Sequence, residues 1–187
     1  MLADRIKLPL VFDAKKMQSD LLSLNKTQWL KHFVTQNYRG DWSIIPLRGP
    51  ANATHPILMS YSDPNCKEFA DTPFLQSLHY LQEVLATFQC SLLSVRLMKL
   101  SAGSEIKTHT DHDLNAEMGT ARLHIPIVTN EKVTFLLNDK LVPIQAGECW
   151  YLRLSDPHSV INHSDADRVH LVLDVTVNAW LESLLHQ

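Results

Sequence analysis

The chain has 187 residues, 45% of them hydrophobic and 20% charged, which is enough for one domain spanning residues 1–187 with a substantial core. Its formal net charge is −3, and it has neither a Lys/Arg tract nor an apolar run of about 18–20 residues, so we expect no nucleic-acid or membrane partner. The widely spaced cysteines, Cys66, Cys90 and Cys149, and the charged residues near the start favour a reducing cytoplasm and no signal peptide.

The N-terminal part alternates apolar stretches with capping and breaking residues. Ile6–Phe12 predicts a strand, and Pro9 within it favours a sheet edge because proline has no N–H for a neighbouring strand. Asp13 is a suitable N-cap for a helix over Ala14–Leu24, where apolar residues recur at helical spacing. We expect a second short helix over Lys26–Thr35.

A strand, a long loop and a helix are predicted next. Trp42–Leu47 reads as a strand, and Gly49–Thr72 is rich in Pro, Asn, Ser and Asp, which is typical of an irregular loop. Loops of this length are often lids or binding loops. Pro73 then favours the start of a helix over Phe74–Phe88, whose leucines at helical spacing should pack against a sheet.

Short strands with turn signals dominate the chain after Cys90. The expected strands are Leu92–Leu100, Ile106–Asp111, Ala121–Val128, Val133–Leu137, Leu141–Ile144, Cys149–Leu154, Ser159–Asn162 and Arg168–Val177. Asn138–Lys140 is a suitable hairpin turn, and Ala179–Leu185 should form a final helical segment. The fold class we expect is therefore mainly β with N-terminal helices, in which residues 1–90 buttress a jelly-roll core over residues 91–178.

His109 and Asp111 form a His-x-Asp motif. On an extended segment, side chains two residues apart project to the same face, so the imidazole and the carboxylate are able to share one ion. His158, at the start of a later strand-like run, is the candidate for a third ligand. Two histidines and one carboxylate are typical of non-haem Fe(II) oxygenases and leave one face of the metal open for a 2-oxo acid and O2. We therefore predict a metal site at these three residues.

A single His-x-Asp motif is a weak signal, because His163 and Asp165 form a second one. Only His170 and His186 follow this second motif, whereas the first has a histidine placed before a strand-like run. We therefore prefer the first motif. His112 alternates to the opposite face and is expected at the rim or in solvent.

Two further polar groups are candidates for carboxylate binding. Arg168 lies ten residues after the third metal ligand (168 − 158), and its planar guanidinium suits a bidentate contact with the far carboxylate of a co-substrate. The alternative is an ion pair with Asp165 or Asp167. Arg122 and His124 share one face of a predicted strand, where they would bind a co-substrate or substrate acid, or else bond to carboxylates elsewhere in the chain.

The spaced set of residues resembles the aspartyl/asparaginyl β-hydroxylase family over Leu92–Val177. The matching motifs are His109-x-Asp111, Arg122-x-His124, His158 and Arg168. The resemblance implies a double-stranded β-helix, cupin-like fold and an Fe(II)- and 2-oxoglutarate-dependent dioxygenase. It implies that the His-Asp-His set binds iron, that Arg168 binds the 5-carboxylate of 2-oxoglutarate, and that His124 lies near the 1-carboxylate. It also implies that Arg122 faces the carboxylate of the substrate.

Arg96, Arg48 and Trp42 are further candidates for lining the substrate pocket. Arg96 has a structural ion pair as its alternative, and Trp42 a place in the core. The function we expect is hydroxylation of a small-molecule amino acid or a short peptide, with 2-oxoglutarate decarboxylated to succinate. The alternatives are a non-oxidative jelly-roll protein that binds a metal or a small ligand, and an interaction module whose histidines are incidental.

Overall fold

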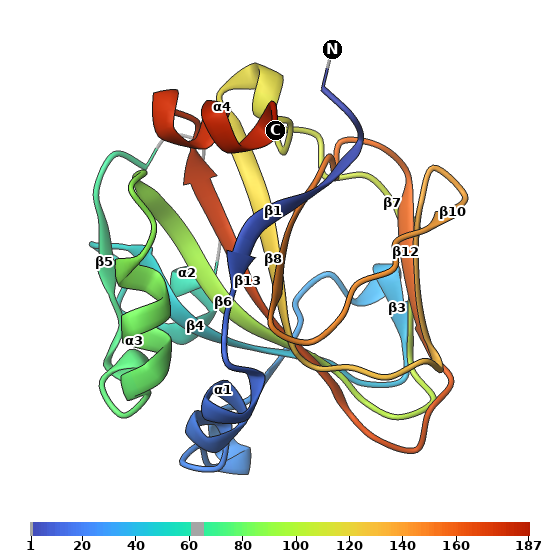
Figure 1. Ribbon diagram of the computed structural model, residues 1–187. Coiled ribbons are helices and arrows are strands. Elements are labelled where there is room, and N and C mark those ends of the chain that lie inside the picture. Colours follow the sequence, from blue (N-terminus) through green and yellow to red (C-terminus); the bar gives the residue numbers. More distant parts are fainter. Residues whose placement is uncertain (1, 61–65) are drawn as a thin grey trace.

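The computed structural model describes residues 2–60 and 66–187 and contains two β-sheets that face each other (Figure 1). The strands of the larger sheet are β1 (Arg5–Val11), β2 (Leu30–Lys31), β4 (Trp42–Pro50), β5 (Phe69–Asp71), β6 (Leu92–Leu100), β8 (Thr120–Val128), β11 (Glu148–Leu152) and β13 (Arg168–Thr176). The strands of the smaller sheet are β3 (Tyr38–Arg39), β7 (Glu105–His109), β9 (Val133–Leu137), β10 (Lys140–Leu141) and β12 (His158–Asn162).

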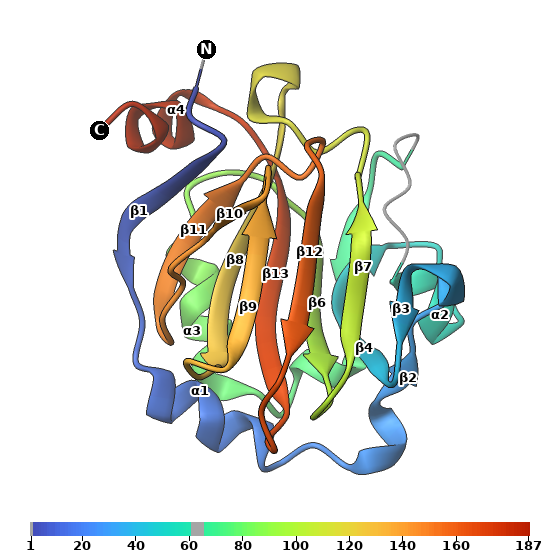
Figure 2. The same cartoon turned by 90° about the vertical axis from the view of Figure 1, so that its right-hand side faces the viewer.

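The strand order confirms the predicted jelly roll. The larger sheet runs β1-β11-β8-β13-β6-β4-β2 with β5 beside β4, and the smaller sheet runs β10-β9-β12-β7-β3. Figure 2 shows β9, β12 and β7 side by side in front of the larger sheet. As predicted from Pro9, β1 is an edge strand.

Helices α1 (Ala14–Leu21), α3 (His79–Ala86) and α4 (Ala179–Leu185) cover the outer face of the larger sheet. The short helix α2 (Pro56–Met59) lies beside β4, and none of its residues is buried. α1 and α3 lie against this sheet (Figure 1), and α1 begins at the predicted cap, where the Asp13 carboxylate accepts hydrogen bonds from the backbone of Lys15 and Lys16. None of the described helices is long and apolar enough to cross a membrane.

Alternation along β13 separates the core from the space between the sheets. The residues of its outer face, packed in the main hydrophobic cluster, are Val169, Leu171, Leu173 and Val175. The residues of its inner face are Arg168, His170, Val172 and Asp174, and all four are buried. The strand therefore places charged side chains between two sheets, where only a partner or a ligand compensates for the loss of water.

Two N-terminal predictions need correction. Lys26–Thr35 is not a helix: a 3-10 turn at Lys26–Gln28 leads into β2, which pairs with the edge of β4. The β-branched Val34 and Thr35 disfavour a helix, and the open edge of β4 gives the segment an alternative partner.

The helix predicted over Phe74–Phe88 is shorter and interrupted. Pro73–Leu75 forms a 3-10 turn, and α3 starts only after Leu78, whose φ of −105° and ψ of 73° lie outside the helical region. The predicted packing is nonetheless observed, because Leu78, Leu81 and Leu85 are buried against the sheet.

Two segments differ from their predicted form. The loop predicted over Gly49–Thr72 contains α2 and β5, and its residues 61–65 lie outside the described part of the chain. The strand predicted over Leu141–Ile144 is reduced to β10, which pairs with β9 only through Lys140 and Leu141, and Pro143 has no N–H with which to extend the pairing.

Candidate active site

The three predicted metal ligands converge between the two sheets. His109 ends β7 and His158 begins β12, and these two residues face each other directly in the antiparallel pairing, with ring centroids 4.2 Å apart. Asp111 follows two residues after the end of β7. One ligand atom from each of the three residues lies within 4.8 Å of the others. The three residues that the sequence pattern selected thus form a single cluster of two imidazoles and one carboxylate.

Backbone carbonyls orient both imidazoles of this cluster. Nδ1 of His109 lies 2.8 Å from the carbonyl oxygen of Lys107, and Nδ1 of His158 lies 3.0 Å from that of Asp156. A carbonyl only accepts, so each ring carries its proton on Nδ1 and presents a bare Nε2 to the cluster. Burial lowers the pKa of His158 to about 4, which keeps this ring in the neutral form that a metal requires.

Asp111 is fixed by its backbone and by one of its two oxygens. Its N–H donates to the carbonyl of Leu154 at 2.8 Å, and Arg122 Nη1 donates to Oδ2 at 2.7 Å. Oδ1 faces Nε2 of His109 at 3.8 Å. One oxygen is therefore held by the arginine, while the other is directed toward the histidines. This arrangement suits a carboxylate that binds an ion through a single oxygen.

Arg122 is held by carboxylates of the protein rather than left open toward a substrate. Its Nε and Nη2 donate to the two oxygens of Asp174 at 2.6 and 2.9 Å, in addition to the bond with Asp111. Although burial acts against it, the charge of Asp174 raises the pKa of Arg122. Arg96 also pairs with Asp174 and donates to the Ser60 carbonyl at 3.2 Å. Both arginines form the structural ion pairs named as alternatives, and both also line the cavity.

Arg168 has a different environment. It is 2% exposed, and the described residues place no carboxylate within ion-pair distance of its guanidinium, so the alternative pairing with Asp165 or Asp167 is absent. Nη2 donates to Nδ1 of His170 at 2.8 Å, the guanidinium carbon lies 5.9 Å from the centre of the Phe135 ring, and Nε has no acceptor. Burial lowers its pKa to about 9. An unpaired buried cation of this kind is costly unless a ligand supplies the counter-charge.

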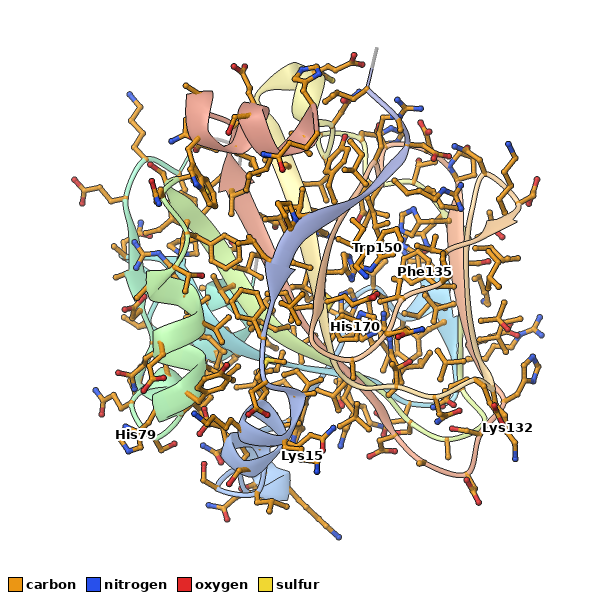
Figure 3. All side chains as sticks on the ribbon, viewed as in Figure 1. Lys15, His79, Lys132, Phe135, Trp150 and His170 are labelled. Atoms are coloured by element: carbon orange, nitrogen blue, oxygen red, sulfur yellow. The ribbon has the colours of Figure 1, made fainter. Side chains whose placement is uncertain are left out.

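A cavity of about 470 Å³ connects these groups. It is lined by the metal cluster, Arg96, Arg122, His124, Arg168 and Asp174, and by the apolar and aromatic residues Phe33, Trp42, Phe69, Met98 and Phe135. Figure 3 shows Phe135, Trp150 and His170 in the space between the two sheets, far from Lys15 and His79 at the periphery. Burial keeps the pKa of His124 well below its usual value, and its Nε2 has no hydrogen-bond partner.

The remaining predicted residues divide between the cavity and other places. Trp42 lines the cavity and is also part of the core. Arg48 does not line it: this guanidinium binds the Asp71 carboxylate at 2.6 Å and the Phe69 carbonyl at 2.8 Å, because the strand turns it toward β5. His112 is exposed at the mouth of the cavity, as its position in the sequence suggested.

Three residues that matter to the cavity were not singled out as site residues from the sequence. The sequence pattern could have identified Asp174 and His170. They lie on the same strand face as Arg168, and apolar residues occupy the positions between them on the opposite face. His32 was hidden by the wrong helix prediction. Its ring stacks on Trp42 with centroids 3.6 Å apart and an interplanar angle of 6°.

Replacing His32 by phenylalanine should remove part of the acid sensitivity of folding. Burial, with the nearby charge of Arg96, lowers the pKa of His32 to about 3, whereas an unfolded histidine titrates near 6.5. The folded pKa is depressed, so the stabilisation is fully present above pH 6.5 and is lost as the pH falls toward 3. Between pH 7 and 4 the wild type should lose roughly 3 kcal/mol more than His32→Phe, as measured by urea unfolding.

The exposed His79 provides the control for this comparison, because His79→Gln should keep the wild-type pH dependence. If His32→Phe also keeps that dependence, the buried neutral state of His32 is not the cause.

Comparison with known proteins points to the same family that the spaced motifs of the sequence resemble. The sequence profile of the aspartyl/asparaginyl β-hydroxylase family matches residues 12–177. An L-proline cis-4-hydroxylase of Rhizobium meliloti (strain 1021) is 29% identical over 177 residues, which are 93% of this chain. The chain spans 61% of the length of that relative.

Solved structures with this fold include oxygenases. An oxidoreductase of the 2OG-Fe(II) oxygenase family from Burkholderia pseudomallei has a TM-score of 0.60 at 11% identity, with 92% of this chain and 85% of that chain covered. A prolyl hydroxylase from Trichoplax adhaerens, in complex with a hypoxia inducible factor peptide fragment, has a TM-score of 0.58 at 10% identity, with 92% and 83% covered. At these identities the likeness is one of fold, whereas the family profile covers most of the chain. The chain belongs to the aspartyl/asparaginyl β-hydroxylase family.

Proposed function

We propose that this protein is an Fe(II)- and 2-oxoglutarate-dependent dioxygenase that hydroxylates an amino acid, free or within a peptide. His109, Asp111 and His158 would hold the ion, and Arg168 would bind the far carboxylate of 2-oxoglutarate. Ferrous iron with 2-oxoglutarate and O2 supplies the oxidation: one oxygen atom enters a C–H bond of the substrate, and 2-oxoglutarate becomes succinate and CO2. The L-proline cis-4-hydroxylase to which the chain is similar supports this class of reaction.

The observation that carries the proposal is the unpaired, buried guanidinium of Arg168 in the same cavity as the His-Asp-His cluster. A hydrolase that uses a metal-bound water needs the cluster but no second cationic site. A dioxygenase that consumes a dicarboxylate needs both, because one end of the co-substrate chelates the metal and the other end requires a counter-charge. The donor set fits iron, since the Nδ1 atoms of both histidines are held by backbone carbonyls, which leaves Nε2 for the ion, and one oxygen of the Asp111 carboxylate is held by Arg122, which leaves the other.

Charge counting supports an acidic substrate. The cavity wall of the described chain contains three buried arginines, Arg96, Arg122 and Arg168, and two carboxylates that bond to them, Asp111 and Asp174. A third carboxylate of the wall, Asp113, is exposed to solvent and is left out of the count because water and salt screen its charge. A divalent ion and a 2-oxoglutarate dianion cancel each other, which leaves one surplus positive charge. One net negative charge on the substrate would balance it, and this agrees with an acidic amino acid or a peptide with a side-chain carboxylate.

The topology, the cysteines and the net charge support three further proposals. We take residues 1–187 as one domain, because strands from the N-terminal half, such as β1 and β4, complete the larger sheet. The free cysteines Cys66, Cys90 and Cys149 agree with a reducing, cytoplasmic setting. The small net charge gives no reason to expect a nucleic-acid partner.

The direct test is a screen of free amino acids and short peptides with Fe(II), ascorbate and 2-oxoglutarate. We expect one substrate class to give succinate and a product heavier by one oxygen atom in equal amounts. Asp111→Ala is the matched control and should give neither. Substrate conversion that proceeds without O2 would favour the non-oxidative alternative, and an absence of succinate with every acid would contradict the proposal.

A further inference from the structure

We propose that His170 is a positioning residue for the carboxylate clamp, in that it fixes the guanidinium of Arg168 while leaving its charge available. This inference rests on the proposed function. His170 belongs to neither the metal cluster nor the set of residues expected to touch a substrate. It lies on the inner face of β13, two residues after Arg168, and is 2% exposed.

The hydrogen bond defines the protonation of the ring. Nη2 of Arg168 lies 2.8 Å from Nδ1 of His170. A guanidinium only donates, so Nδ1 is a bare acceptor and the ring proton resides on Nε2. The same nitrogen lies 3.4 Å from Nδ1 of His124, which must then be the donor of that longer contact. One nitrogen atom of His170 thus orients both cavity groups that are expected to lie near the two ends of 2-oxoglutarate.

An arginine without such an anchor would be a poor clamp. Its side chain has many rotamers, and each one frozen on ligand binding lowers the affinity. Among the described residues, the Arg168 guanidinium contacts the His170 nitrogen and the face of Phe135. The histidine supplies the directional contact, so it sets the plane in which the remaining N–H groups face the ligand.

A neutral acceptor is also better suited to this role than a carboxylate. Burial of the ring, together with the charge of Arg168, keeps the pKa of His170 well below its usual value, so the ring stays uncharged. An aspartate in the same position would hold the guanidinium equally well but would neutralise it and compete with the incoming carboxylate. Arg122, which is paired with Asp174, shows this second arrangement in the same cavity. Arg168 therefore keeps an unbalanced positive charge beside the neutral His170, whereas the carboxylate of Asp174 balances the charge of Arg122.

Three substitutions separate orientation from charge. His170→Asn places an amide oxygen at the position of Nδ1 and keeps a neutral acceptor. His170→Leu has a similar shape and no acceptor. His170→Asp keeps the acceptor and adds a negative charge. The ligands are 2-oxoglutarate and 2-oxopentanoate, in which a methyl group replaces the far carboxylate, so the two chelate a metal alike and differ only at the clamp.

The measurement is the ratio of the two dissociation constants, from anaerobic titration of the Fe(II)-loaded protein. We expect the wild type to prefer 2-oxoglutarate by at least about 30-fold, as for a buried charge pair. His170→Asn should keep this preference within about threefold, whereas His170→Leu and His170→Asp should each reduce it by about 10- to 100-fold. Binding of Co(II) alone should be unchanged in all three, which separates a clamp defect from a disturbed metal site.

The possible outcomes are distinct. A wild type that does not distinguish the two ligands would overturn the proposed co-substrate, and this inference with it. If the wild type prefers 2-oxoglutarate and either His170→Leu or His170→Asp shows the same preference, only the role of His170 is overturned. If His170→Leu does not fold, His170→Asn and His170→Asp, which are nearly isosteric with each other, still give the comparison. An equal preference for 2-oxoglutarate in these two variants would contradict the inference.

Discussion

Replacing Arg168 by methionine should weaken 2-oxoglutarate binding strongly and yet not destabilise the ligand-free protein. Losing one member of a buried charge pair typically costs about 2–5 kcal/mol, which corresponds to roughly 30- to several thousand-fold in affinity. In the free protein Arg168 has no carboxylate partner among the described residues. An apolar side chain of similar length removes an uncompensated buried charge, so the unfolding free energy should stay the same or rise by about 1–4 kcal/mol.

Arg122→Met is the matched control for this prediction. Arg122 is also buried but bonds to both Asp174 and Asp111, so its removal leaves Asp111 without its arginine and the buried Asp174 with Arg96 alone. We expect this variant to lose about 3–5 kcal/mol of stability. Urea unfolding of the two ligand-free variants, with anaerobic 2-oxoglutarate titration, measures both effects. Equal destabilisation in the two would mean that Arg168 is a structural residue.

Replacing His109 by alanine should reduce the affinity for divalent metals by at least about 100-fold, since loss of an outer partner of a ligand alone costs 10- to 100-fold. His109 contributes one of the two Nε2 atoms of the cluster. Titration calorimetry with Co(II), which tolerates the same ligands, measures the change without dependence on turnover. His163→Ala, in the other His-x-Asp motif, is the control and should bind Co(II) like the wild type.

The His163 control is informative because the two motifs are identical in spacing. His163 and Asp165 are both exposed, and within the described residues they belong to no metal-ligating group. Unchanged Co(II) binding in His109→Ala, or equal losses in both variants, would place the metal elsewhere.

Sequence periodicity predicted the core of the fold well. The alternation in β8 and β13 gave the inner and outer faces correctly, because two packed layers leave a strand no other way to bury Leu123, Ile125 and Leu171. The short N-terminal elements were harder to predict. Lys26–Thr35 pairs with β4 over only Leu30 and Lys31, and such an edge pairing depends on a strand that is distant in sequence.

The sequence predicted which residues meet at the candidate site but not which of them pair with each other. Spacing identified the residues that converge at the metal cluster, since cross-strand neighbours in a jelly roll bring His109 beside His158. It could not assign partners to the arginines. Arg122 and Arg168 both follow the same alternation, and only the position of Asp174 across the pairing from Arg122 decides which of them is neutralised.

The two-sided character of β13 has a consequence for how this protein tolerates change in chain length. Inserting one residue directly after Leu171, with the rest of β13 kept in register, would turn Val169 and Leu171 toward the cavity and Arg168 toward the helices, so folding and chemistry would fail together. Inserting two would restore the faces but shift Arg168 along the strand by roughly 7 Å, beyond reach of its ligand. Substitutions at single positions, by contrast, affect one face at a time. Insertions and deletions should therefore be accepted in the exposed turn at residues 165–167 and rejected in the strand that follows it.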